Sequence, residues 1–280
     1  MITGVRWRRC REDEVEQVVR RLETWPCEVG GAVRHMFPLS AMVEGATTVR
    51  VAEDRDRWAA AVVMPGRILV PCGDGSVVAA AGIPSRRWRL MVGDAAAAEG
   101  VLEHTRRTPD LRVHVQRFLT VDPARVPDEG DVADPGVRLA LVEDIPALAR
   151  LAVTLHVDDG FGPDPGRSGL RGYARRFERT VRDRLIYCVG PVGEPIAKLE
   201  RSVSSRRYGV QLAGIVVEPS HRGRGLGRAL VAAAVRHAMA QMGVGRPISL
   251  HVRANNEPAL RAYRGAGFVD REEWRLAVRS

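Results

Sequence analysis

The sequence predicts an α/β (α+β) protein of two domains, in which helices flank a mixed, mostly antiparallel sheet. Short apolar or alternating runs, bounded by glycine and proline turns, indicate strands. Longer amphipathic or alanine-rich segments between them indicate helices. A stretch rich in Pro, Gly and Asp, residues 121–138, has neither periodicity and marks a linker. We therefore expect domains at residues 1–134 and 135–280.

In the first half, the pattern predicts two helices, at residues 13–25 and 95–105. It predicts four strands, at residues 48–52, 59–64, 67–70 and Leu111–Val121. The last of these alternates apolar and polar residues and suits a half-buried position. No chemical motif falls in this half, so its residues predict an α/β domain but no activity.

In the second half, the order of elements is clearer. The predicted helices are residues 143–155, an arginine-rich segment at 172–184, a long alanine-rich segment at 224–241, and 257–265. The predicted strands are residues 138–142, 185–189, 195–203, Gly209–Val217, 248–252 and 268–278. Together they give the order βααβββαβαβ, a mixed sheet with helices on its faces.

Composition excludes several classes of protein. With 45% apolar and 28% charged residues, the chain resembles an ordinary globular protein. The N-terminal residues lack the apolar run of a secretory signal, and charges interrupt every apolar stretch, so we expect a cytoplasmic protein without a membrane partner. The four cysteines form no CxxC pair and the seven histidines show no ligand spacing, so no metal is expected.

The positive charge is unevenly distributed. Residues 1–134 contain 19 basic and 20 acidic side chains, and residues 135–280 contain the other 24 basic and 14 acidic ones. A polyanionic ligand of the second half fits this asymmetry. Coenzyme A and nucleic acid are both polyanions, but aromatic residues make up only 5% of the chain and do not cluster with the arginines. We therefore expect no nucleic-acid partner.

The strongest motif follows the predicted strand Gly209–Val217. A short turn leads into Arg222-Gly223-Arg224-Gly225-Leu226-Gly227, which opens the alanine-rich helix. Glycines allow backbone N–H groups to approach an anion at a helix N-terminus, where the dipole also favours negative charge. Arg222, Arg224 and Arg228 add positive charge, so the segment suits a pyrophosphate. A Walker A loop requires GK[ST] and a dinucleotide fingerprint requires GxGxxG with a following acidic residue, and neither is present.

Val217-x-Pro219 followed by Arg222-x-x-Gly225-x-Gly227 resembles the pyrophosphate-binding signature of the GNAT superfamily of N-acyltransferases. A second part of that family's pattern follows at the expected distance, as Asn256-x-x-Ala259-x-x-x-Tyr263-x-x-x-Gly267-Phe268. The predicted element order also matches the layout of the GNAT fold.

The second half is further similar to two-domain bacterial GNAT proteins, whose N-terminal domain is a degenerate GNAT-like domain. The landmarks are Asp158-Asp159-Gly160, Gly172-Tyr173, Lys198-Leu199-Glu200 and Gly214. The first half has no Arg-x-x-Gly-x-Gly loop, so a GNAT-like domain there would have lost its own cofactor site.

The resemblance implies an N-acetyltransferase that transfers an acetyl or short acyl group from acyl-CoA to a primary amine of a small molecule or amino-acid-like acceptor. It implies direct attack, acetyl-CoA or another acyl-CoA as donor, and strands 209–217 and 248–252 that splay apart to admit pantetheine. It also implies that Tyr263 is the general acid and that Asn256 fixes the strand-to-helix crossing. The implied cofactor-binding residues are Ile215, Val216, Val217, Arg222, Gly223, Arg224, Gly225, Leu226, Gly227, Arg228, Asn256 and Ala259.

Glu200 is the candidate for the base, because it matches a glutamate of the two-domain group; a solvated position on an alternating strand is the other interpretation. Asp158, Asp159 and Gln211 are candidates for contact with the acceptor, although the two aspartates also fit an ordinary loop. A catalytically silent CoA-binding sensor or scaffold is the alternative function. A monomer and a homodimer both remain open.

Overall fold

The computed structural model describes residues 4–45, 47–105, 108, 110–132, 134–243 and 245–279. The chain divides into two compact units. Unit 1 comprises Met1–Phe118, Arg253–Asn255 and Arg271–Ser280, and unit 2 comprises Leu119–Val252 and Asn256–Asp270. The units differ from the predicted ranges 1–134 and 135–280, because residues 119–134 belong to unit 2 and the C-terminal residues to unit 1. None of the described helices is long and apolar enough to span a membrane.

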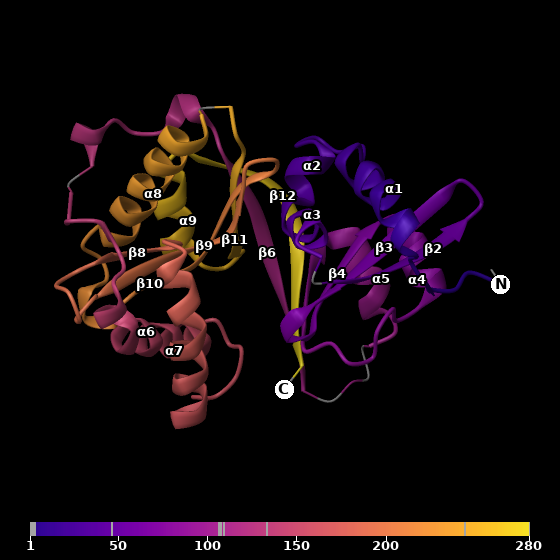
Figure 1. The fold of residues 1–280 in the computed structure, drawn as a ribbon, viewed down its shortest axis with the longest axis horizontal. Helices are drawn as coiled ribbons and strands as arrows, with labels where there is room; N and C mark the ends of the chain where they lie inside the picture. The colour runs from indigo at the N-terminus through magenta and orange to yellow at the C-terminus, as the bar shows by residue number, and fades with distance from the viewer. Residues whose placement is uncertain are drawn as a thin grey trace. The chain divides into compact units, whose positions relative to one another are not determined.

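Unit 1 contains five described helices and a sheet (Figure 1). Its elements are β1 (Arg8–Arg9), α1 (Glu12–Glu23), α2 (Gly31–Arg34), α3 (Met36–Val43), β2 (Thr48–Asp54), β3 (Arg57–Met64), β4 (Ile68–Gly73), α4 (Gly75–Ala81), β5 (Leu90–Asp94), α5 (Ala95–Leu102) and most of β6 (Leu111–Val121). Strands β1 to β4 pair antiparallel in sequence order, whereas β4 and β5 pair in parallel. The predicted helices and strands of this half are confirmed, Leu111–Val121 with the predicted bounds and the others with shifted ends, but β1, α2, α3, α4 and β5 were not predicted.

The last strand explains why the C-terminal residues belong to unit 1. Strand β12 (Phe268–Arg279) pairs antiparallel with β5, in a register that places Trp274 opposite Asp94 and Val278 opposite Leu90. Its ion pairs within unit 1 include Arg275 with Glu99, at 2.7 Å. The alternating pattern of residues 268–278 predicted a strand correctly, but such a pattern does not identify the strand's partner.

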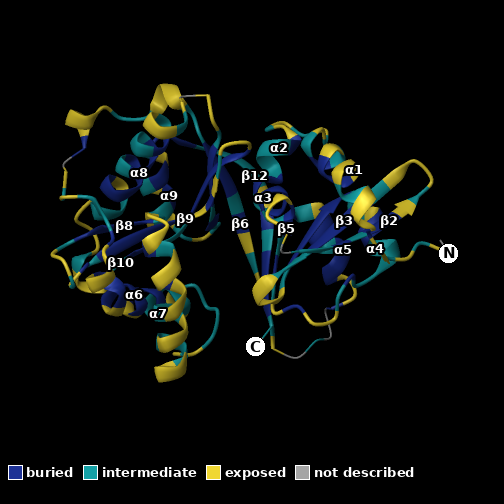
Figure 2. Cartoon of the chain, viewed as in Figure 1, coloured by how far each residue is buried: buried dark blue, intermediate teal, exposed yellow. Residues whose placement is uncertain are grey.

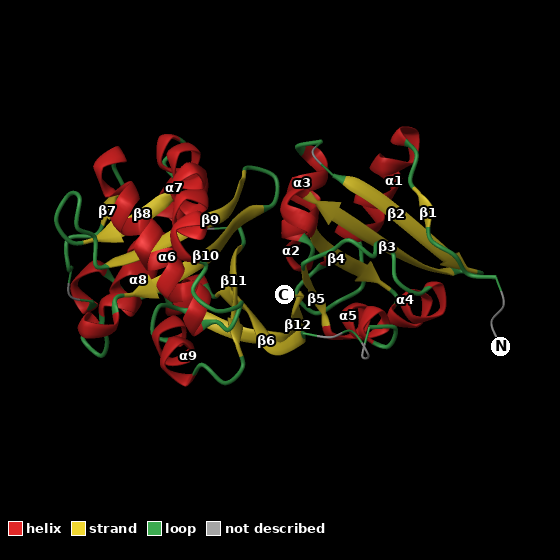
Figure 3. Ribbon diagram, turned by 90° about the horizontal axis from the view of Figure 1, so that it is seen from below, coloured by secondary structure: helices red, strands yellow, loops and turns green. Residues whose placement is uncertain are grey.

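Unit 2 has the predicted order of elements (Figure 3). They are β7 (Arg138–Leu139), α6 (Ile145–Asp158), α7 (Gly166–Arg182), β8 (Ile186–Val189), β9 (Ala197–Ser205), β10 (Gly209–Val217), α8 (Leu226–Met242), β11 (Ile248–Arg253), α9 (Glu257–Arg264) and the start of β12. Strands β7 to β10 pair antiparallel in sequence order, and β10 pairs in parallel with β11.

The sheet of unit 2 is buried on both faces (Figure 2). Alternate residues of β8 show this, because Tyr187 and Val189 pack in one apolar cluster with α8, whereas Ile186 and Cys188 pack in another with α6 and α7. Successive side chains of a strand point to opposite faces, so α8 covers one face and the α6–α7 pair covers the other. Alanines of α8, such as the fully buried Ala232 and Ala234, allow this helix to approach the strands closely.

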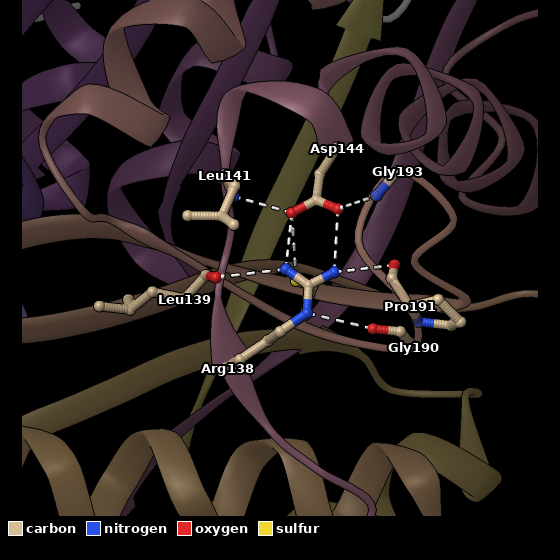
Figure 4. Close-up of polar contacts among 8 residues, drawn as sticks. Arg138, Leu139, Leu141, Asp144, Gly190, Pro191 and Gly193 are labelled. Carbon is tan, nitrogen blue, oxygen red and sulfur yellow. Dashed lines mark hydrogen bonds and ion pairs between the residues drawn. The ribbon is translucent and has the colours of Figure 1, made fainter.

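A buried ion pair fixes the start of α6 (Figure 4). Arg138 donates to both carboxylate oxygens of Asp144, at 2.7 and 2.9 Å, and Asp144 is fully buried. The same carboxylate accepts the backbone N–H groups of Leu141 and Gly193, each at 2.8 Å. Burial alone would raise the pKa of Asp144, but the hydrogen bonds from Arg138 and the two backbone groups outweigh it and lower that pKa. The cluster therefore joins β7, the turn before α6 and the turn after β8.

Candidate functional site

The predicted pyrophosphate loop lies between β10 and the N-terminus of α8. Gly225 is the N-cap of α8 and adopts the left-handed conformation, with φ of 79°, and Gly223 has φ of 76°. No side chain caps the helix, and a Cβ built on either glycine would meet no atom within 4 Å. No side chain thus occupies the N–H groups of the first turn of α8 and the loop glycines leave open space beside them, which fits the binding of a pyrophosphate by backbone donors.

Three exposed arginines surround this loop. Arg222 donates to the carbonyl of Val217, at 3.0 Å, and forms an ion pair with Asp158, at 2.5 Å. Arg224 donates to the carbonyl of Ser220, and Arg228 to that of Gly265. Asp158, the last residue of α6, is thus a neighbour of the loop. Asp158 was predicted to contact the acceptor substrate, and the structure places it beside the predicted cofactor site.

Strands β10 and β11 diverge beside the loop, as predicted. Their parallel pairing covers Val210–Leu212 and Ile248–Leu250, and these described strands continue beyond it without further pairing to each other. Residues Ile215–Val217 therefore lie on a segment of β10 that has left β11. Such an edge of backbone donors and acceptors can pair with an extended chain.

The divergence coincides with a bulge in β10. Ala213 pairs with Glu200 and Val216 with Lys198, so Gly214 and Ile215 together lie opposite Leu199. Gly214 has φ of 60°, in the region that favours glycine. A bulge bends its strand and changes the direction of its peptide groups, and bulges are frequent beside active sites.

Tyr263 lies in the last turn of α9 and is 7% exposed. Burial, together with the nearby negative charge of Asp159, raises the pKa of its hydroxyl above the ordinary value of a tyrosine. Tyr263 is therefore protonated at neutral pH, as a general acid must be. The side chain of Asn256 accepts the N–H of Ala259 at 3.2 Å and caps α9, and its role at the strand-to-helix crossing stays a prediction.

Glu200 is surrounded by cations. Its carboxylate accepts hydrogen bonds from Lys198, at 2.6 Å, and from Arg176 on α7, at 2.9 Å. Burial raises the pKa of Glu200, but the two positive charges outweigh it and lower that pKa overall. The interpretation of Glu200 as a solvated strand residue is wrong, because the residue is 8% exposed. Its role as a base stays a prediction.

Gln211 is buried beside Ser202, whose hydroxyl donates to the Gln211 carbonyl at 3.2 Å and lies 3.3 Å from its side-chain oxygen. Its contact with an acceptor stays a prediction. Sequence reasoning missed Lys198 and Arg176 as parts of the site. A signal existed for Lys198, which is the only lysine in the sequence. Arg176 had no such signal within its arginine-rich helix.

Within the described part of the chain, no group of three or more His, Cys, Asp or Glu side chains is arranged to hold a metal ion. The site consists of a glycine-capped helix end, a diverging strand edge, a protonated tyrosine and a buried cluster of charges.

Comparisons with known proteins agree with this geometry. The sequence profile of the acetyltransferase (GNAT) family matches residues 172–268. Streptothricin acetyltransferase from Streptomyces lavendulae is 34% identical over 141 residues, which cover 50% of this chain and 67% of that protein. The chain belongs to the GNAT acetyltransferase family. The matched segment contains both predicted motifs and every residue of the glycine loop.

Solved structures extend the likeness to the full length of this GNAT protein. An acetyltransferase from the GNAT family of Colwellia psychrerythraea aligns with a TM-score of 0.59 and 11% identity, over 98% of each chain. A tandem GNAT protein from the clavulanic acid biosynthesis pathway aligns with a TM-score of 0.54 and 14% identity, again over 98% of each chain. At such low identity these matches establish the fold alone. They support the prediction of a GNAT fold in both halves.

Proposed function

We propose that this GNAT protein is an acetyl-CoA-dependent N-acetyltransferase that acts on a primary amine of a small molecule or amino-acid-like acceptor. The observation that carries the proposal is the combination, in one unit, of an uncapped helix end, a diverging strand edge and a protonated Tyr263. These are the three features that a direct transfer from a CoA thioester requires of the protein.

Each feature has a distinct task. Acetyl-CoA, when bound, supplies an acetyl group activated as a thioester. The first-turn N–H groups of α8 and the loop glycines bind the pyrophosphate, with Arg222, Arg224 and Arg228 contributing positive charge. The backbone of Ile215–Val217 binds the pantetheine arm, and Leu226 and Ala259 lie at the N-terminal ends of α8 and α9 beside it. A short acyl donor other than acetyl fits the same contacts.

Tyr263 handles the proton of the leaving group. A new N–C bond forms between the acceptor amine and the acetyl carbon as the C–S bond breaks, and the Tyr263 hydroxyl gives its proton to the departing sulfur. The proton that the amine loses returns to the tyrosine oxygen through solvent, so the enzyme is regenerated. A tyrosine hydroxyl is protonated at neutral pH, so Tyr263 can give its proton to the sulfur as the thiolate charge develops.

The acceptor is proposed to approach from the end of α6. Asp159 lies near enough to Tyr263 for its charge to affect that residue's pKa, and Asp158 contacts Arg222. Carboxylates beside the acid favour an acceptor that arrives as an ammonium ion, which loses one proton to solvent before its nitrogen attacks the thioester. Gln211 remains a candidate for orienting this acceptor.

A thiol-release assay with acetyl-CoA and a panel of amines tests the proposal, with Tyr263→Phe compared with Tyr208→Phe. Tyr208 is also buried in unit 2 but lies in the turn between β9 and β10, so it is a matched control. We expect Tyr263→Phe to lower kcat about 100-fold with unchanged acetyl-CoA affinity, and Tyr208→Phe to leave kcat unchanged. Binding of acetyl-CoA without thiol release for any amine would instead indicate a CoA-binding sensor or scaffold.

A further inference from the structure

Lys198 is an unusual residue in this chain. It is the only lysine among 43 basic residues, and it is fully buried at 0% exposure. Burying an ammonium group is unfavourable unless the group is paired and hydrogen-bonded. An ammonium is also more compact than the planar guanidinium that this sequence uses elsewhere. The partners of Lys198 therefore indicate why a lysine occupies this position.

The partners of Lys198 lie in the bulge of β10, on β9 and on α7. The ammonium donates to Glu200, at 2.6 Å, and to the backbone carbonyl of Gly214, at 2.8 Å. It also lies 5.3 Å from the centre of the Phe177 ring. Arg176 donates to Glu200 in turn and lies 4.8 Å from the same ring. The result is a chain of contacts from the exposed Arg176 on α7 through the buried Glu200 and Lys198 to the bulge.

Space around the bulge is fully used. A Cβ on Gly214 would lie 2.5 Å from the Glu200 carboxylate and 3.0 Å from the Lys198 ammonium. The two charged groups thus pack directly against the Gly214 backbone. Because pairing between β10 and β11 ends at Leu212, this contact lies where β10 leaves its neighbour.

Holding one carbonyl fixes a whole peptide group. The C=O of Gly214 and the N–H of Ile215 belong to the same planar, trans peptide unit, so they point in opposite directions. The hydrogen bond from Lys198 to the Gly214 carbonyl therefore directs the Ile215 N–H away from Lys198. Ile215 begins the strand edge that we assign to the acyl-pantetheine arm.

We propose that Lys198, held by Glu200 and Arg176, is a positioning residue that aims the Ile215 N–H at the thioester carbonyl oxygen. The inference rests on the proposed function of the site. Glu200 then serves as the counter-charge of Lys198 rather than as the base. Two cations occupy its oxygens and lower its pKa, and both effects weaken a proton acceptor.

Lys198→Met tests the proposal, with Arg201→Met as a matched control. Arg201 is a second buried cation on β9, but it donates to Gln241 and to the carbonyl of Arg184, outside the site. The measurements are kcat, the affinity for CoA, which has no acyl carbonyl, and the infrared stretch of the ¹³C-labelled thioester carbonyl in bound acetyl-CoA. A donor that is aimed at the carbonyl lowers its stretching frequency.

For Lys198→Met, we expect kcat to fall about 10- to 100-fold, the carbonyl frequency to return toward that of free acetyl-CoA, and CoA affinity to stay unchanged. Arg201→Met should change neither kcat nor the frequency. If Lys198→Met has the kcat of the wild type, or if its bound thioester carbonyl has the same frequency as in the wild type, the proposal is overturned. The proposed function fails separately, if the wild-type protein neither binds acetyl-CoA nor releases thiol.

Glu200 provides the second variant. If Lys198→Met does not fold because Glu200 loses its main partner, the double variant Lys198→Met/Glu200→Gln removes both charges and should show the same loss of kcat. Glu200→Gln alone retains the bond from Lys198 to Gly214, so we expect kcat to fall only a few-fold with an unchanged pH profile. Loss of the acidic limb of the kcat–pH profile in this variant would identify Glu200 as the base and overturn its positioning role.

Discussion

Helices α4 and α8 have the same place in the element order of their units, but they begin differently. Each follows the last of four antiparallel strands and precedes a strand that pairs in parallel with that last strand. In unit 1, Asp74 caps α4, because its carboxylate accepts the N–H groups of Ser76 and Val77, at 2.9 and 3.2 Å. In unit 2, Gly225 caps α8 with no side chain.

The difference decides which helix end can bind an anion. Asp74 satisfies the donors of α4 and places a negative charge where a pyrophosphate would bind. The start of α4 is also closed by packing, because a Cβ on Gly75 would lie 2.4 Å from the carbonyl of Ala96. The donors of α8 have no side-chain cap, and the loop glycines leave open space beside them. The two helix ends thus differ in their capacity to bind an anion through one capping residue and its surroundings.

The aromatic residues allow the two units to be observed separately. All five tryptophans belong to unit 1 and all four tyrosines belong to unit 2. Tryptophan fluorescence therefore follows unit 1, and the tyrosine signal in near-ultraviolet circular dichroism follows unit 2.

The largest effect on stability is expected for unit 2. Asp144→Asn leaves Arg138 without its buried counter-charge and should lower the free energy of unfolding by about 3 kcal/mol. Urea unfolding followed through the tyrosines measures this loss. Asp183→Asn is the matched control, because its ion pair with Arg179 is exposed and should contribute under about 0.5 kcal/mol. Equal effects of the two substitutions would contradict the role given to the buried pair.

The same ion pair predicts a dependence on pH. The pKa of Asp144 in the folded protein is lower than the ordinary value of about 3.9. Its contribution is therefore complete above that ordinary value and is lost as the pH falls through the lower, folded-state pKa. The difference in stability between wild type and Asp144→Asn should shrink below about pH 4. A constant difference down to pH 2 would show that the charge of Asp144 is not its source.

A smaller effect is expected at the cap of α4. Asp74→Ala removes a side-chain cap and should destabilise unit 1 by about 1 kcal/mol, as followed by tryptophan fluorescence in urea. Acetyl-CoA affinity should stay unchanged, because the proposed cofactor site lies at the N-terminus of α8 and not at that of α4. A change in affinity of tenfold or more would break the comparison between the two helix ends.

The smallest effect is expected at the pair of Arg222 and Asp158, whose side chains are 46% and 42% exposed. The Asp158 carboxylate and the pyrophosphate of the cofactor would compete for the Arg222 guanidinium. Asp158→Asn weakens this competition and should tighten acetyl-CoA binding by about 2- to 5-fold at low salt. The gain should disappear in high salt, where exposed ion pairs are screened. Weaker binding in the variant would show that Asp158 supports the cofactor site and does not compete with it.

The sequence predicted elements best where one pattern dominated. Strands Leu111–Val121 and Gly209–Val217 have the predicted bounds, because alternation and a continuous apolar run are strong signals. Helix α3 was missed because Pro38 interrupts its pattern, and α4 because its seven residues lie between glycines. The motifs predicted the glycine loop. The family resemblance that they carry predicted the divergence of β10 and β11 and the place of Asn256 between strand and helix.

Contacts across the sheet could not be predicted. Charged residues on a strand suggest a solvated face, so the burial of Lys198 and Glu200 had no signal in periodicity. Their meaning depends on a bulge that offsets the register of β9 and β10. The pairing of β12 with β5 joins residues far apart in the sequence and was equally hidden.

Calorimetric titration of acetyl-CoA into the wild-type protein and Gly225→Asp tests the central claim most directly. The substitution gives α8 the kind of carboxylate cap that α4 has. Gly136→Asp is the matched control, since Gly136 also has a positive φ and open surroundings but lies in the loop before β7. We expect wild type and Gly136→Asp to bind alike and Gly225→Asp to bind about 100-fold more weakly, because a like charge would face the pyrophosphate. Equal binding by all three proteins would contradict the assignment of the cofactor site to the N-terminus of α8.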